Sequence, residues 1–188
     1  MLPNKESVLI SREDGGNLVI NPPRPIWERG ELTAKELTRW SFLVAATGQA
    51  MLETLPQLEN GCINYWEAGN WALNDEAEPS GVKKHPREYR RVHLHLLGRN
   101  PESANPATKW GESPQFPAYA ERHVWAQGYE RLTADECKKI VEQAEHLLLT
   151  KYELQKNEID PWRICTACGY PTAMRDGRSC EECTGMET

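Results

Sequence analysis

The stretch that most constrains the fold runs from Arg91 to Arg99 and reads RVHLHLLGR. Polar residues at 91, 93 and 95 alternate with apolar residues at 92, 94 and 96. This period of two is typical of a β-strand with one face buried in a core. We therefore expect the side chains of Arg91, His93 and His95 on one face, about 7 Å apart along the strand. Such a face suits an anionic, phosphorylated ligand, although an isolated HxH pair is more often incidental or part of a metal site.

The sequence predicts two amphipathic helices. Thr33 and Glu36 form a capping-box pattern, and the apolar residues that follow recur at helical spacing until Pro56. Thr133 and Glu136 repeat this pattern, and we expect the second helix to run to about Glu153. Together with the predicted strands, these helices indicate an α+β fold.

The remaining segments are predicted to be strands, loops and arms. Strands are expected over 18–21, 62–66, 92–97 and 123–127. Residues 1–16 are expected to form a short leader strand or polar arm. The proline-rich segment 101–120 is expected to be a loop, because proline interrupts regular structure.

Four of the six cysteines form a C-x2-C-x11-C-x2-C pattern near the end of the sequence. They are Cys165, Cys168, Cys180 and Cys183. Two such pairs supply the four thiolates of a tetrahedral structural Zn²⁺ site, whereas a redox function needs only one pair. We therefore predict a domain over 1–155, followed over 156–188 by a linker and a zinc knuckle. Cys62 and Cys137 stand alone in apolar surroundings and are expected to be buried.

The bulk composition excludes some classes of protein. No apolar run approaches the roughly 20 residues of a membrane-spanning helix, and the first residues lack the layout of a signal peptide. We therefore expect a cytoplasmic protein. The formal net charge of −6 disfavours extensive coating of nucleic acid, although it leaves room for a local basic site.

Three segments in order resemble the histidine triad (HIT) superfamily. HLHLLGR resembles its signature strand, with His93 at the middle histidine and His95 at the third. The segments 17–26 and 61–70 resemble an early strand and the block that precedes the histidine strand, and residues 110–114 stand where many members have a Trp-Pro segment. The resemblance covers roughly residues 10–155. Arg91 replaces the first histidine of the family pattern.

The resemblance implies an antiparallel sheet with two main helices and a nucleotide hydrolase or nucleotidyl transferase. His93 would attack the α-phosphorus to form a nucleotidyl-histidine, His95 would assist, and Arg91 would supply charge. The nucleotide contacts implied by the same blocks are Asn21, Arg24, Asn64, Asn70 and Arg99. The expected ligand is a nucleotide or nucleotidylated small molecule, and the resemblance favours a homodimer. Two alternatives remain open: a nucleotide-binding adaptor with little turnover, and a protein that processes nucleic-acid ends, each using the zinc knuckle to contact a partner.

Overall fold

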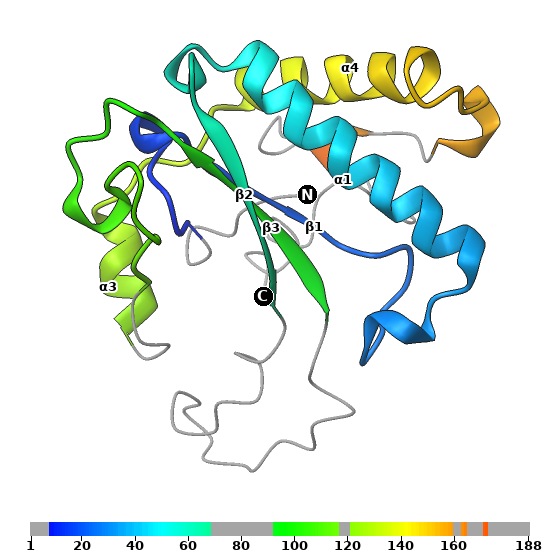
Figure 1. Ribbon diagram of the computed structural model, residues 1–188, viewed down its shortest axis with the longest axis horizontal. Coiled ribbons are helices and arrows are strands. Elements are labelled where there is room, and N and C mark those ends of the chain that lie inside the picture. Colours follow the sequence, from blue (N-terminus) through cyan, green and yellow to red (C-terminus); the bar gives the residue numbers. More distant parts are fainter. Residues whose placement is uncertain (1–7, 69–91, 117–120, 160–162, 165–170, 173–188) are drawn as a thin grey trace.

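The computed structural model describes residues 8–68, 92–116, 121–159, 163–164 and 171–172. The described chain has an α+β fold in which two long helices pack against one face of a three-stranded antiparallel sheet. Figure 1 shows the helices α1 and α4 together on one side of the sheet, with the short helix α3 lying apart from them. Among the described residues, no helix combines the length and the apolar character needed to cross a bilayer.

The elements follow one another in a simple order. The strands are β1 (Asn17–Ile20), β2 (Cys62–Ala68), β3 (His93–Arg99), β4 (Arg163–Ile164) and β5 (Pro171–Thr172). The α-helices are α1 (Ala34–Thr54), α3 (Arg122–Gln127) and α4 (Ala134–Thr150). Short 3-10 helices span Arg12–Asp14, Arg29–Glu31, Pro56–Leu58, Pro106–Thr108 and Lys156–Glu158.

Both predicted helix starts are confirmed. Thr33 caps α1 and Thr133 caps α4, and in each case a glutamate three positions later completes a capping box. The helix α1 ends just before Pro56, as predicted. The helix α4 ends at Thr150, earlier than the predicted Glu153, because Glu153 adopts a left-handed backbone with φ of 54° that a helix cannot contain.

The histidine strand lies in an antiparallel sheet, as expected. The strand order is β1-β3-β2, so β3 is central and pairs with an antiparallel neighbour on each side. Leu94 and Leu96 point into the main core, where they pack with residues of α1 and α4. Because successive side chains alternate across a strand, His93 and His95 lie on the opposite face. The fold thus leaves the two histidines on the face without the long helices.

The N-terminal segment approaches the histidine strand so closely that position 98 must be glycine. The backbone N–H of Gly98 donates to the carbonyl of Gly16 at 2.8 Å, and a Cβ atom at position 98 would overlap the backbone of Gly15. Gly15 itself has φ of 124°, a conformation that side chains disfavour. The N-terminal segment can therefore pack against β3 only while both positions are glycine.

Three smaller predictions were wrong. The segment 123–127 belongs to helix α3, because its short apolar run fits either structure and the helix buries Ala126 while leaving Val124 in solvent. Cys62 is exposed because it begins β2, an edge strand, whereas Cys137 is buried as predicted. The described part of the predicted arm, residues 8–16, is largely buried and forms a 3-10 helix at Arg12–Asp14.

The first residues of the predicted linker pack against the domain. Glu158 accepts a hydrogen bond from Arg39 of α1 at 2.7 Å, and Ile159 contacts the main core. Beyond it, β4 pairs with β5 in antiparallel fashion, with Ile164 opposite Pro171. This pairing brings together the two ends of segment 165–170, which contains the first cysteine pair.

Candidate functional site

His93 and His95 form a directly hydrogen-bonded pair on β3. Their Nε2 atoms lie 3.0 Å apart, and the two rings meet edge to face with centroids 4.8 Å apart. His93 is partly exposed, whereas only 5% of His95 is accessible. The pair therefore has one member that a ligand can reach and one member that is enclosed.

An aromatic stack encloses His95. Trp66 of β2 lies directly opposite His95 in the sheet register, and their rings stack with centroids 5.2 Å apart. Phe116 stacks on Trp66 with centroids 4.6 Å apart and the planes inclined by only 8°. These rings adjoin a second small cluster of buried residues that contains Leu9, Ile10 and Leu97. The stack shields the buried histidine from solvent.

The enclosure keeps His95 neutral. Burial, with a smaller contribution from the charge of His93, lowers the pKa of His95 to about 3. The Nδ1 atom of His95 is buried and has no hydrogen-bond partner. His95 is therefore uncharged at neutral pH, and its hydrogen-bonding capacity is directed through Nε2 toward His93.

We expect the burial of His95 to make the protein acid-sensitive. The unfolded chain gains a proton at this histidine below about pH 6.5, whereas the folded protein excludes the proton until about pH 3. Stability should therefore fall as the pH drops through this window, by up to ~1.4 kcal/mol per pH unit. Urea unfolding of the wild type and of His95→Gln between pH 7 and pH 4 measures the difference. Equal slopes for the two proteins would show that His95 is not held neutral.

Arg99 and Asn64, both expected to contact a nucleotide, bind each other. Arg99 is 4% exposed, and its Nη1 donates to Asn64 Oδ1 at 2.7 Å. Its Nη2 donates to the backbone carbonyls of Thr108, Lys109 and Glu112 at distances of 2.8–3.2 Å. Arg99 thus fastens the segment 106–112 to the histidine-bearing face of the sheet.

The other two described candidates, Asn21 and Arg24, follow strand β1 in the sequence. Asn21 is exposed and directly follows Ile20, the register partner of Leu94. Arg24 donates from Nε to the carboxylate of Glu36 at 3.0 Å and from Nη2 to the carbonyl of Glu31 at 2.5 Å. Arg24 is therefore engaged with α1, whereas Asn21 lies at the end of β1 next to the histidine strand.

The remaining predicted residues lie outside the described part of the chain. They are Arg91, Asn70 and the zinc candidates Cys165, Cys168, Cys180 and Cys183. Within the described residues, no group of three or more His, Cys, Asp and Glu side chains could hold a metal ion.

Trp66 and Phe116 were missed as site residues by the sequence reasoning. The sequence could have indicated Trp66, because Trp66 stands two positions after Asn64 on a predicted strand and therefore lies on the same face as Asn64. For Phe116 the sequence gave no such indication, since it lies within the proline-rich segment 101–120, whose path depends on the contacts of Arg99.

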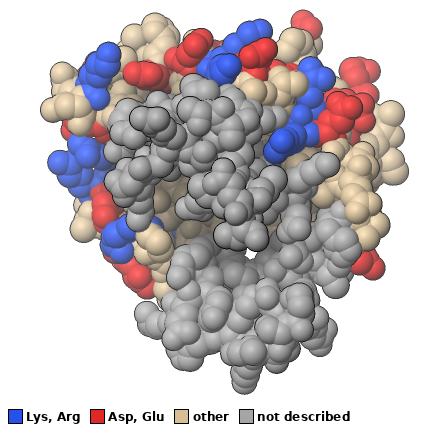
Figure 2. Space-filling model, turned by 180° about the vertical axis from the view of Figure 1, so that it is seen from behind, with Lys and Arg blue, Asp and Glu red and all other residues tan. Residues whose placement is uncertain are grey.

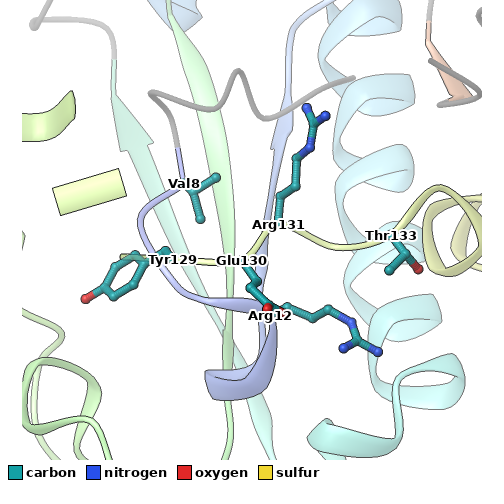
Figure 3. A pocket seen from close by; sticks show the side chains of 6 residues that line it. All are labelled: Val8, Arg12, Tyr129, Glu130, Arg131 and Thr133. Carbon is teal, nitrogen blue, oxygen red and sulfur yellow. The ribbon is translucent and has the colours of Figure 1, made fainter. Parts of the chain in front are cut away.

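A second candidate is an open pocket on another part of the molecule, shown in Figure 3. It is lined by Val8, Arg12, Tyr129, Glu130, Arg131 and Thr133. Two arginines line it, and one of them, Arg12, is paired with Glu136 of α4, with Nε 2.8 Å from the carboxylate.

One face of the described part of the molecule can be inspected for a basic patch that would bind nucleic acid. On the face in Figure 2, basic and acidic side chains of the described residues are interspersed around the rim. A duplex-binding surface normally gathers Lys and Arg into a continuous patch. This part of the surface thus gives no support to the nucleic-acid alternative.

In comparisons with known proteins, no protein-family model, no curated protein and no solved structure matches the chain.

Proposed function

We propose that this protein has a HIT-like fold and cleaves or transfers nucleotides at the α-phosphate through a nucleotidyl-histidine intermediate. The observation that carries the proposal is the hydrogen-bonded pair of His93 and His95, placed on the sheet face opposite the long helices. A neutral imidazole with an accessible ring nitrogen is a competent nucleophile at neutral pH. The similarity of the segments around both histidines to HIT proteins supports the same chemistry.

In the proposed reaction, Nε2 of His93 attacks the α-phosphorus and forms a P–N bond. The bond from phosphorus to the leaving group breaks, and the leaving group departs with the electron pair. Water then attacks the same phosphorus, the P–N bond breaks, and a nucleoside monophosphate is released. His95, which burial keeps neutral in the protein without ligand, would donate a hydrogen bond to a phosphoryl oxygen.

Arg91 is the proposed source of positive charge at the phosphoryl group. The sequence places it two positions before His93, where the family pattern has a histidine. Guanidinium binds phosphate strongly but stays protonated, so it cannot donate and regain a proton. We therefore expect a preference for substrates with good leaving groups, such as polyphosphates, over amines or alkoxides.

We propose in addition that the C-terminal cysteines bind one structural Zn²⁺. Cys165, Cys168, Cys180 and Cys183 would supply four thiolates, which match the tetrahedral preference of zinc. The pairing of β4 with β5 supports this, because it closes the chain on either side of the first cysteine pair. The ion would brace the end of the chain and take no part in the reaction.

Metal analysis tests the zinc proposal. We expect about one zinc per chain after dialysis, and none after replacement of all four tail cysteines by serine. His93→Ala is the matched control and should retain the metal. Zinc that survives the loss of all four cysteines would place the metal elsewhere and contradict the assignment.

The function itself is tested with a panel of adenylylated and guanylylated compounds. Incubation should release a nucleoside monophosphate from at least one of them. Binding without product would favour the adaptor alternative, and strong salt-dependent affinity for DNA or RNA would favour nucleic-acid end processing. Either of those results would overturn the proposed enzyme.

A further inference from the structure

We propose that Trp66 is a positioning residue that holds His95 in the tautomer with its proton on Nε2, so that the lone pair of His93 Nε2 is kept oriented for attack. The catalytic consequence rests on the proposed function, but the tautomer can be measured without any turnover.

The contact between the two histidines admits only two arrangements when both rings are neutral. The Nε2 atoms are 3.0 Å apart, so one carries the proton and the other accepts it. If His95 donates, its own Nδ1 is unprotonated and His93 presents its lone pair on Nε2. If His93 donates, the proton of His95 must sit on Nδ1 and the nucleophilic nitrogen of His93 is blocked.

The environment of His95 Nδ1 decides between these arrangements. This atom is buried and has no hydrogen-bond partner. An unpaired N–H inside a protein is rarer and more costly than an unpaired acceptor. His95 is therefore expected to carry its proton on Nε2 and to donate to His93, whose Nε2 then bears the lone pair.

Trp66 maintains this environment. Its ring stacks on one face of the His95 ring at 5.2 Å, and Phe116 stacks on Trp66 at 4.6 Å, so aromatic rings cover this side of the buried imidazole. On the other neighbouring strand, Val19 is the register partner of His95 and is apolar. Among the described residues around the ring, on β1, β2, β3 and the segment ending at Phe116, His93 is the titratable group that faces His95.

Substrate binding would use the same proton. When a phosphate enters the site, one of its oxygens can replace His93 Nε2 as the acceptor of the N–H of His95. The hydrogen bond then moves from the nucleophile to the phosphate and releases the lone pair of His93 toward phosphorus. Removing Trp66 would admit water to Nδ1 and allow the proton to occupy either nitrogen.

Nitrogen NMR of protein with ¹⁵N-labelled histidine tests the tautomer directly. The chain has five histidines, and His95→Gln identifies the signals of residue 95. In the wild type without ligand at pH 7, Nε2 of His95 should appear protonated and Nδ1 unprotonated. The signals should stay unchanged down to about pH 4.5.

Variants distinguish a role of Trp66 in positioning the proton of His95 from a role in packing alone. Trp66→Ala should mix the two tautomers and raise the pKa of His95 back toward its ordinary value, because burial is what lowers it. It should also lower nucleotide release ~10- to 100-fold, with an added ionisation in the pH profile. Trp66→Phe should restore the wild-type tautomer because it keeps a flat ring. Trp110→Ala, which removes an exposed tryptophan, is the matched control and should change neither signal.

Different results bear on the positioning role of Trp66 and on the proposed enzyme activity. Phe116→Ala, which leaves Trp66 in place, should show the same titration shift in smaller degree and serves if Trp66→Ala does not fold. A wild-type His95 protonated on Nδ1, or a tautomer and titration unaffected by Trp66→Ala and Phe116→Ala, would overturn the positioning role. A correct tautomer in a protein that releases no nucleotide would overturn the enzyme and leave the role of Trp66 standing.

Discussion

Replacing His93 with alanine should lower nucleotide release at least ~10³-fold, because the covalent step through its Nε2 is then lost. His93 is only partly buried and faces away from the main core, so far-UV circular dichroism should hardly change. Steady-state rates on the best compound of the nucleotide panel measure the effect. His95→Ala should also reduce the rate, though by less.

The matched control for this prediction is His146→Ala. His146 is an exposed histidine on α4, which packs on the opposite face of the sheet from His93. Its loss should leave the rate within about twofold of the wild type. Near wild-type turnover in His93→Ala would refute the mechanism, whatever the effect of the control.

Replacing Arg99 with methionine should lower the free energy of unfolding by ~3–5 kcal/mol. The change removes hydrogen bonds from a buried guanidinium to Asn64 and to three backbone carbonyls, and it strands those acceptors. Arg99→Lys should recover only part of this, because an ammonium lacks the planar fork that reaches several acceptors at once. Urea unfolding at pH 7 measures both changes.

Arg12→Met provides the comparison for a surface ion pair. The side chain of Arg12 is 42% exposed and pairs with Glu136, so its loss should cost about 1 kcal/mol or less. A cost for Arg99→Met as small as that for Arg12→Met would show that Arg99 does not hold the segment 106–112. Arg99 would then be free for the nucleotide contact that the sequence resemblance implies.

Local rules in the sequence were sufficient to predict the frame of the fold. The two capping boxes at Thr33 and Thr133 are short-range signals, and a helix start depends on little else. The alternation of polar and apolar residues over 91–97 predicted a strand with one buried face. The strand β3 has this property, with Leu94 and Leu96 in the core. The helix at 122–127 was not predicted, because its few apolar residues fit the period of a strand as well as that of a helix. Tertiary packing then decides which of the two structures forms.

The histidine pair was predictable, but the surroundings that give it its properties were not. Period-two spacing put His93 and His95 on one face, whereas the neutral state of His95 depends on Trp66 and Phe116, which approach from distant segments. Likewise, the sequence predicted Arg99 and Asn64 as ligand contacts, and only the folded chain shows that they bind each other. Such pairings depend on sheet register and on loop path, which local patterns do not specify.

The most direct test of the proposed mechanism is capture of the covalent intermediate. The protein is mixed with an excess of the best nucleotide substrate, quenched within the first turnover, kept away from acid that would cleave a P–N bond, and digested for mass spectrometry. We predict a nucleotidyl adduct on His93 that appears before free nucleoside monophosphate and is absent in His93→Ala. Release of nucleotide with no adduct at any histidine, or with the adduct on another residue, would contradict the proposal.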